Sequence, residues 1–188
     1  MPQASVTQPK LSNAEFNSLH DFYNATNGPF WRWHNVSIHS APWNFSIPHV
    51  NPCEANWQGL ICSCGLTSCS VSQIFLDHHN LAGHLPDSMK NFEQMSSLIL
   101  RSNNITGTIT ASIGNMTDLE ELDLSYNRLY GEIPSSIGRL WKLKTLKLGM
   151  NRLTKIPEAL YDLSNLETLD IISNRMSSSI SPCLGNLT

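Results

Sequence analysis

The sequence predicts an α/β solenoid, a right-handed horseshoe with a parallel sheet on its concave face and a helical, disulfide-stapled cap at its N-terminal end. Two observations carry this prediction. One apolar pattern occurs five times after residue 70, at offsets of 24, 24, 24 and 23 residues, and the segment before it combines a helix signal with four of the five cysteines. Repeats of this length stack so that each buries its apolar face against its neighbours. We therefore expect a disordered N-terminus at residues 1–10, a cap at residues 11–70 and five repeats at residues 71–188, the last of them incomplete.

The cap should open with a helix. Ser12 is a good N-cap residue and Glu15 follows three positions later, which makes a capping box. Leu11 and Phe16 flank the box as a hydrophobic staple. The Asn-Gly-Pro sequence at residues 27–29 ends the helix. The predicted helix covers the open end of the solenoid with an apolar face made of Phe16, Leu19, Phe22 and Tyr23.

A loop and a cysteine cluster complete the cap. Trp31, Trp33 and Trp43 are the expected anchors of the loop. Cys64 and Cys69 flank a turn-prone Gly-Leu-Thr-Ser segment, so a hairpin would bring them together as a disulfide. The alternative is a four-cysteine zinc site, which the cysteine spacings fit poorly.

Each repeat begins with a strand whose leucines alternate with outward-facing residues. The copies are Val71-x-x-Ile74-x-Leu76, Met95-x-x-Leu98-x-Leu100, Leu119-x-x-Leu122-x-Leu124, Leu143-x-x-Leu146-x-Leu148 and Leu166-x-x-Leu169-x-Ile171. Three residues later comes an asparagine whose buried amide can bind backbone groups left unpaired at the turn. His79 replaces it in the first copy. The predicted structural ladder is Asn103, Asn127, Asn151 and Asn174, and the whole pattern is the signature of a leucine-rich repeat.

A second pattern narrows the class of repeat. Residues 81–86 and 129–134 both have Leu-x-Gly-x-Leu/Ile-Pro, and residues 137–140 continue with Ile-Gly-x-Leu. This resembles the LxGxIPxxIGxL return of plant-type leucine-rich repeats, which occur in receptor-like kinase ectodomains and in secreted polygalacturonase-inhibiting proteins. Copies four and five depart from the Gly of this return, which weighs against a second, lateral strand there.

The end of the cap carries the same resemblance. Residues 53–62 have the order Cys-x-x-x-Trp-x-Gly-Leu-Ile-Cys, similar to the CxxxWxGVxC segment that precedes plant-type repeats. The two cysteines pair in that family, which implies a disulfide between Cys53 and Cys62. A closed loop of this size stabilises a fold by roughly 2 to 3 kcal/mol in the chain-entropy account. The fifth cysteine, Cys183, is either a buried free thiol or the partner of a cysteine beyond residue 188.

The composition excludes several classes of function. A net charge of −3 with 14% charged residues gives no electrostatic footprint for nucleic acid. No apolar run approaches the length of a membrane span, and the first residues contain no signal-peptide core. No phosphate loop, metalloprotease or hydrolase motif occurs. His78 and His79, adjacent on a predicted strand, should face opposite sides. We therefore expect no enzyme, no cofactor and no metal site.

Two features nevertheless favour an extracellular or cell-surface protein, although no signal peptide is visible. The cysteines cluster as in secreted domains. Glycosylation sequons are also in excess of the roughly one or two expected by chance. They begin at Asn24, Asn35, Asn44, Asn104, Asn115 and Asn186. We interpret the missing signal as an incomplete N-terminus.

The candidate site is the concave face, because its outward side chains include apolar residues of the kind that anchor interfaces. The expected ligand-binding residues are Phe75, Ile99, Arg101, Asp123, Tyr126, Lys147, Met150 and Asp170. The resemblance implies a protein or peptide ligand, bound by the ectodomain of a receptor-like protein. A membrane span can follow downstream in such a protein, and a co-receptor is a further candidate partner. The alternatives are a secreted inhibitor of a foreign polysaccharide hydrolase and a structural or ice-binding protein. The last would need a regular face of small hydroxylated residues, which the columns of outward side chains lack.

Overall fold

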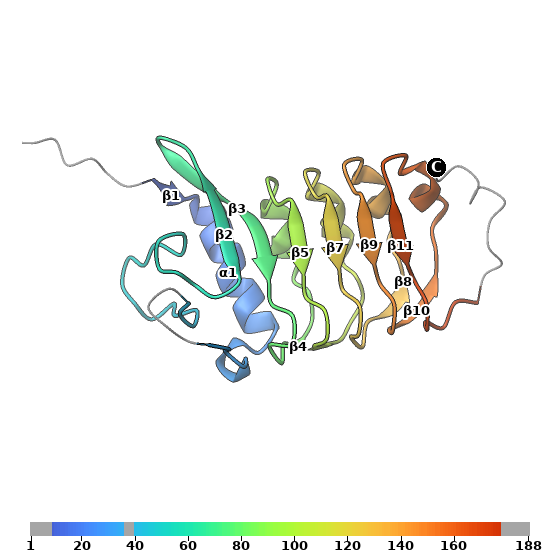
Figure 1. The fold of residues 1–188 in the computed structure, drawn as a ribbon, viewed down its shortest axis with the longest axis horizontal. Coiled ribbons are helices and arrows are strands. Elements are labelled where there is room, and N and C mark those ends of the chain that lie inside the picture. The colour runs from blue at the N-terminus through green and yellow to red at the C-terminus, as the bar shows by residue number, and fades with distance from the viewer. Residues whose placement is uncertain (1–8, 36–39, 178–188) are drawn as a thin grey trace, which may run out of the picture.

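The computed structural model of the chain describes residues 9–35 and 40–177. Within these ranges the repeats stack side by side, each with one strand on a shared sheet, and the cap helix lies at one end of the stack (Figure 1). The predicted α/β solenoid with a parallel sheet and an N-terminal cap is confirmed. The N-terminal segment expected to be disordered falls mostly on residues 1–8, outside the described residues, but Lys10 already lies in a strand. The expected boundary at residue 11 is therefore too late.

The main sheet has seven strands in the order β1-β3-β5-β7-β9-β11, with β2 paired antiparallel to β3 and the other neighbours parallel. Its register advances by one repeat per strand, so that Leu98, Leu122 and Leu146 are partners. All three are fully buried, as the alternation of the strand requires. The strands are β1 Lys10–Leu11, β2 Leu60–Cys64, β3 Ser68–Phe75, β5 Ser97–Ile99, β7 Glu121–Asp123, β9 Thr145–Lys147 and β11 Thr168–Asp170.

Each coil returns through a lateral strand and a short 3₁₀ helix behind the sheet (Figure 1). The lateral strands are β4 Ala82–Gly83, β6 Asn104–Ile105, β8 Tyr130–Glu132 and β10 Arg152–Lys155, and the helices are η2 Asp87–Asn91, η3 Ala111–Asn115, η4 Ser135–Arg139 and η5 Glu158–Asp162. The expectation against a lateral strand in copy four is wrong. Strand β10 pairs with β8, and a register shift between Leu153 and Lys155 absorbs the changed spacing. In copy five, residues 175–177 form no strand, and the rest of this return lies outside the described residues.

The cap begins with helix α1, Asn13–Ala25, which is tied to the first repeat at its N-terminal end. The Ser12 hydroxyl accepts from the Glu15 N–H at 3.2 Å, as the capping box predicts. The Glu15 carboxylate also accepts from the Val71 N–H at 2.9 Å. A residue in the first turn of α1 thus supplies the acceptor for a backbone N–H group in a strand of the solenoid. Among the described residues, no helix is long and apolar enough to cross a bilayer.

The other end of α1 meets the lateral strand β4. The Ala82 and His84 N–H groups donate to the carbonyls of Thr26 and Ala25 at 3.0 and 3.1 Å. Gly83 between them has φ 115°, and a Cβ there would lie 2.0 Å from the Ala25 oxygen. Only glycine allows the two backbones to approach this closely.

Aromatic side chains fill the space between α1 and the loop after it, where the short 3₁₀ helix η1, Gly28–Phe30, begins. Phe22 is fully buried, with its ring edge-on to Trp31 at 5.7 Å. Trp43 stacks on Trp57 at 5.5 Å. The Trp31 indole N–H donates to the Thr26 carbonyl at 2.8 Å, so this buried indole is satisfied. The cap therefore has a core of its own that merges with the leucine core of the repeats.

Two disulfides join the cysteines of the cap, Cys53 to Cys62 and Cys64 to Cys69. The first is the pair that the family resemblance implies. The second links directly opposed residues of the antiparallel β2–β3 hairpin, as the turn between them suggested. Cys183 lies outside the described residues.

Candidate functional site: the concave face

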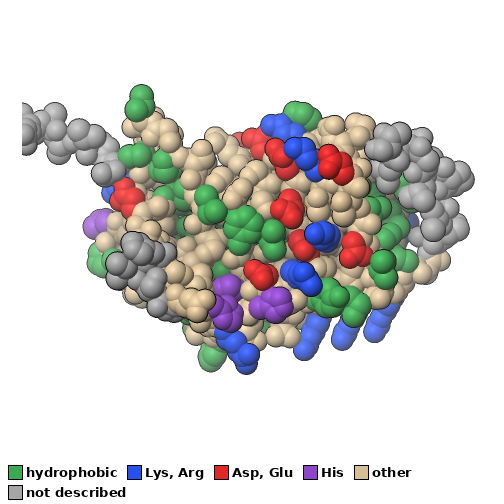
Figure 2. Space-filling model, in the orientation of Figure 1, with side chains coloured by type: hydrophobic (Ala, Val, Ile, Leu, Met, Phe, Trp, Pro, Cys, Tyr) green, Lys and Arg blue, Asp and Glu red, His purple; other side chains and the backbone are tan. Residues whose placement is uncertain are grey.

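The concave face presents apolar and charged side chains interleaved across the strands (Figure 2). Phe75 and Ile99 are half-buried. Tyr126 and Met150 are 48% and 46% exposed. Ile172, which lies beyond the end of β11, is 73% exposed. Large apolar side chains therefore reach solvent in each of the five repeats.

Asp123 does not belong to this surface, although it was expected there. Its side chain is only 4% exposed. Its Oδ1 accepts from the Ser125 N–H at 2.9 Å and from the Ser125 hydroxyl at 2.5 Å, which closes a local turn. Because the Asp123 side chain is buried, its carboxylate is not accessible to a ligand on this face. The position of Asp123 in the outward column was predicted correctly, but its role was not.

The charged members of the face have neighbours of complementary character. The Arg101 guanidinium lies 5.2 Å from the centre of the Tyr126 ring. Lys147 and Asp170 are register partners on β9 and β11, so opposite charges adjoin. Seven of the eight expected residues therefore stand at least partly open on one continuous surface, with Asp123 as the exception.

The backbone at this edge of the face adopts an unusual conformation. Tyr126 and Met150 have φ 56° and 57°, in the left-handed region that favours glycine and asparagine. Ser102 and Ser173 occupy the same repeat position with φ 56°. The turn after each strand imposes this conformation. Three copies place a bulky side chain in it, because His78 occupies the same position in the first repeat with φ 61°.

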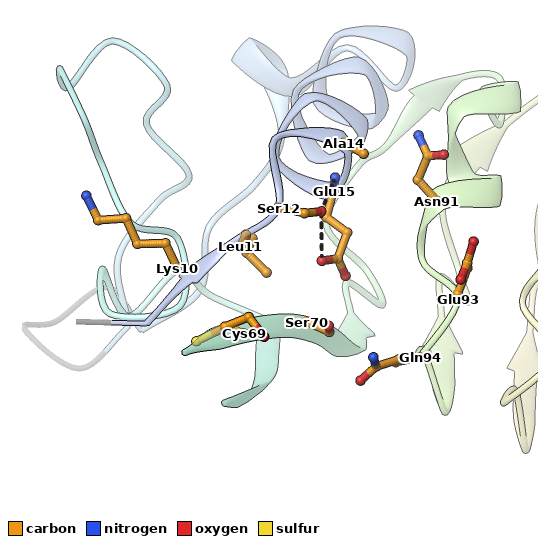
Figure 3. Close-up of a pocket in the computed structure, with 11 residues that line it drawn as sticks. Lys10, Leu11, Ser12, Ala14, Glu15, Cys69, Ser70, Asn91, Glu93 and Gln94 are labelled. Atoms are coloured by element: carbon orange, nitrogen blue, oxygen red, sulfur yellow. Dashed lines mark hydrogen bonds between the residues drawn. The ribbon is translucent and has the colours of Figure 1, made fainter. Parts of the chain in front are cut away.

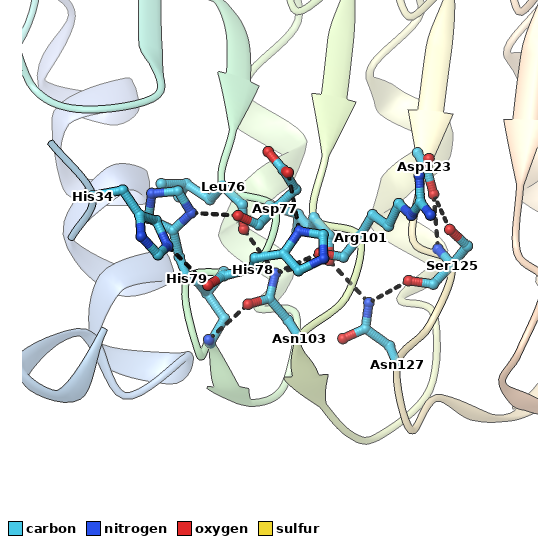
Figure 4. A network of polar contacts seen from close by, with 12 residues as sticks. His34, Leu76, Asp77, His78, His79, Arg101, Asn103, Asp123, Ser125 and Asn127 are labelled. Carbon is cyan, nitrogen blue, oxygen red and sulfur yellow. Dashed lines mark hydrogen bonds and ion pairs between the residues drawn. The ribbon is translucent and has the colours of Figure 1, made fainter. Parts of the chain in front are cut away.

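Directly behind this edge lies the asparagine ladder (Figure 4). The Asn127 amide donates to the carbonyls of Leu100 and Leu124 at 2.9 and 3.1 Å, and its oxygen accepts from the Ile105 N–H at 3.0 Å. Asn103, Asn151 and Asn174 repeat these contacts one coil apart. The ladder therefore links every described turn to its neighbour and fixes the rim of the candidate site.

His79 takes the ladder position in the first repeat, in a turn rather than on the strand expected for it (Figure 4). The side chain is 6% exposed. Its Nδ1 lies 2.7 Å from the Asp77 carbonyl, and its Nε2 lies 2.9 Å from Gln58 Oε1 in the cap. Burial lowers the pKa of His79, assisted by the nearby His34 and His78 and opposed by the Asp77 carbonyl bond and carboxylate. The joint between cap and solenoid thus contains a buried imidazole, whose charged form burial disfavours.

Replacing this imidazole should change how stability depends on pH. A histidine pKa below its ordinary value means that the unfolded chain takes up a proton first, so its contribution is complete above about pH 6.5 and falls as the pH drops toward the folded pKa. His79→Asn should remove that contribution, which would appear as a flatter curve of unfolding free energy between pH 7 and pH 5 than the parent shows. Parallel curves for His79→Asn and the parent would contradict the assignment.

A hollow of about 360 Å³ lies where α1 meets β3 (Figure 3). Glu15 lines it, and burial raises the pKa of this carboxyl, while the bonds from Val71 and Ser12 oppose the shift. Because Glu15 is bonded to the helix and to the first repeat, we assign the hollow a structural role.

The cysteine cluster offers no metal ligands. The Sγ atoms of Cys53, Cys64 and Cys69 lie within 4.8 Å of one another, but all three belong to disulfides. A metal would require thiolates. The zinc alternative therefore does not fit the structure.

Comparison with known proteins supports a leucine-rich-repeat assignment. The family model described as Leucine Rich Repeat matches residues 118–140 and 165–187. A chain of the BIR3 - SERK2 complex from Arabidopsis thaliana is similar, with a TM-score of 0.72 and 28% identity over 89% of this chain and 85% of that one. The BIR2 ectodomain from Arabidopsis thaliana gives 0.70 and 26%, over 93% and 88%. The chain is a plant-type leucine-rich-repeat protein. No curated protein sequence matches it.

A structure with higher sequence identity, but with a much longer chain, also matches this leucine-rich-repeat protein. The plant peptide hormone receptor RGFR1 in complex with RGF2 has a TM-score of 0.61 and 41% identity over 70% of this chain. The match covers only 20% of that receptor chain. The shared part is thus a short stretch of a longer solenoid.

The sequons differ in how well their asparagines could accept a glycan. Four asparagines are exposed: Asn24, Asn35, Asn44 and Asn115. Asn104 is half-buried, and its amide donates to the Asn80 side chain at 3.1 Å. Asn186 lies outside the described residues. Glycosylation stays a prediction, and we expect Asn104 to be the least accessible of the described acceptors.

One set of exposed residues beside the site lies outside the strand columns. Arg128, Arg152 and Arg175 each follow a ladder asparagine directly. All three side chains are exposed. Aligning the residue after each ladder asparagine would have revealed them, because the repeat places that residue in the same position on every coil.

Proposed function

We propose that this protein is the ligand-binding part of a receptor-like protein, a non-enzymatic extracellular module that recognises a peptide or protein along its concave face. Support comes from the surface itself and from similar structures that include a plant peptide hormone receptor in complex with RGF2. The cap disulfides favour an oxidising compartment outside the cytosol.

One observation carries the proposal: Tyr126 and Met150 keep large exposed side chains in left-handed backbone. That conformation costs a residue with a Cβ about 1 to 2 kcal/mol, whereas glycine and asparagine adopt it readily. Neither side chain is fully packed, so packing offsets little of this cost. Retention of strain at an exposed position is typical of a binding surface.

The surroundings fit an interface anchor. Tyrosine combines a rigid apolar ring with a hydroxyl and is enriched among residues that dominate binding energy. Arg101 lies over the Tyr126 ring and holds it, while Met150 offers an adaptable side chain on the next coil. Phe75 and Ile99 continue the apolar character toward the cap. An extended peptide lying along the coils would meet several of these side chains together.

The double variant Tyr126→Asn/Met150→Asn tests the proposal, because it should be more stable and yet bind less. We expect the free energy of unfolding to rise by about 2 kcal/mol, roughly 1 kcal/mol for each residue, as strain is relieved. Peptides selected on the parent chain from a displayed random library should bind the variant at least roughly tenfold more weakly, since anchor side chains are lost. Calorimetric titration and denaturant melts measure the two effects.

Tyr130→Asn is the matched control, because Tyr130 is 54% exposed but lies on the lateral strand β8. It should keep the affinity of the selected peptides. Equal binding by the double variant and the parent would show that the concave face is not the recognition surface.

A further inference from the structure

The lower rim of the solenoid carries a second, electrostatic feature. The residue after each ladder position forms a column of Asn80, Asn104, Arg128, Arg152 and Arg175. Its backbone serves the same purpose in successive coils: the Arg128, Arg152 and Arg175 N–H groups donate to carbonyls of the preceding coil at 2.8, 2.7 and 2.9 Å. At this position the backbone hydrogen bonds join adjacent coils. The fold therefore places no requirement on the side chains there. We call the three arginines the arginine stripe.

The two ends of the column differ in how their side chains are satisfied. The Asn104 amide donates to Asn80 at 3.1 Å, and the Asn80 amide donates to the Phe30 carbonyl at 3.1 Å. The arginine stripe, in contrast, makes no ion pair with any of the residues that the structure describes, and basic side chains project from the lower edge of the repeats (Figure 2). Arginines on successive coils lie roughly 5 Å apart along the backbone and repel one another.

Other stacked charges in this fold alternate in sign. Lys142 pairs with Asp118 at 2.5 Å, and Lys144 pairs with Glu120 at 2.7 Å, each across one coil. Lys155 pairs with Glu132 at 3.5 Å in the same way. The arginine stripe differs, because it stacks three positive charges on successive coils. Mutual repulsion of these charges would destabilise the fold, whereas binding of an anionic partner would explain why they are stacked.

The apolar edge of the concave face adjoins the stripe. Tyr126 and Met150 stand two residues before Arg128 and Arg152 in their respective coils, and the exposed Ile172 stands three before Arg175. Two parallel rows result, one apolar and one basic, that run along the solenoid. A uniformly charged polyanion would use only the basic row. A peptide whose apolar and acidic side chains alternate would use both.

We propose that the arginine stripe and the apolar row beside it dock an acidic peptide segment whose carboxylates pair with the guanidinium groups. An extended segment lying between the rows directs alternate side chains to opposite sides. Its apolar side chains meet Tyr126, Met150 and Ile172, and its carboxylates meet the stripe, where guanidinium groups bind them in bidentate fashion. The inference rests on the proposed function, and it specifies the chemistry of the ligand.

The experiment uses a short fluorescein-labelled peptide of alternating Glu and Val, with the Gln and Val peptide as its uncharged counterpart. Fluorescence anisotropy against the parent chain should show binding of the Glu peptide, weakening as salt is added. The triple variant Arg128→Gln/Arg152→Gln/Arg175→Gln should bind it at least roughly tenfold more weakly. The control triple variant Arg32→Gln/Lys90→Gln/Arg139→Gln removes the same charge at exposed positions elsewhere and should keep the affinity.

Several outcomes would overturn the inference. Equal weakening by both triple variants would show a response to net charge alone. Tighter binding of a linear polyuronic acid than of the Glu peptide, unaffected by Tyr126→Asn, would show that the stripe binds a bare polyanion. If the Glu peptide fails to bind while library-selected peptides still require Tyr126 and Met150, the stripe is not part of the site and the proposed function stands. If the selected peptides ignore those two residues, the proposed function itself fails.

Discussion

Replacing Asn127 by alanine should lower the free energy of unfolding by about 3 kcal/mol. The side chain serves backbone groups on two adjacent coils: it donates to Leu100, Leu124 and Ser125 carbonyls and accepts from the Ile105 N–H. Alanine has no group to replace these bonds. A single buried polar group left without its partner costs about 1 to 3 kcal/mol, and the loss of several places this variant at the upper end.

Denaturant melts of the purified chain measure this effect, and the adjacent residue provides the control. Tyr126→Ala should change the free energy of unfolding by less than about 0.5 kcal/mol, because its side chain is half exposed and outside the core. Asn127→Gln keeps the amide but adds a methylene, so it should also destabilise the chain, since the ladder requires the amide at a fixed depth. A larger loss for Tyr126→Ala than for Asn127→Ala would mean that the ladder does not hold the turns together.

The ladder illustrates which parts of this fold could be predicted from sequence. Strand register, the interior leucines and the buried asparagines all follow from a period of about one coil, because each coil repeats the same backbone environment. Asp123 shows what the repeat period does not predict. Its column is correct, but Ser125 two residues later captures its carboxylate, and such a local bond is invisible to periodicity.

The candidate site could be located but not characterised from the sequence. The columns identified Tyr126 and Met150 as outward residues, but the left-handed backbone beneath them depends on the turn that the whole coil imposes. The arginine stripe lies one residue after the ladder, outside the strand columns from which the site was predicted. The joint at His79 also required the structure, because its partner Gln58 comes from the cap.

The cap was predicted element by element, yet its connection to the repeats was not. A capping box predicts that Glu15 bonds within its own helix, whereas the carboxylate also reaches the Val71 N–H. Gly83 is part of a repeat motif, but its approach to Ala25 decides how the helix seats on the first coil. Contacts between elements that are distant in sequence arise from tertiary packing, which propensities do not encode.

The second large effect concerns the aromatic core of the cap. Phe22→Ala should destabilise the chain by about 4 kcal/mol, because it removes a fully buried ring that contacts Trp31 and Trp43 and leaves a cavity. Phe30→Ala is the matched control, since the Phe30 ring is 67% exposed in the same cap and should cost less than about 0.5 kcal/mol.

Two probes then show whether the cap and the repeats unfold together. Four of the five tryptophans lie in the cap, so fluorescence reports mainly on that region, whereas far-UV circular dichroism reports on the whole chain. The leucine core is continuous from Phe22 to the last described repeat, and the first coil cannot bury its apolar face without the cap. Both probes should therefore shift to lower denaturant by the same amount in Phe22→Ala. A fluorescence transition that moves alone would show that the cap unfolds as an independent unit, and the cap would then no longer count as part of the solenoid core.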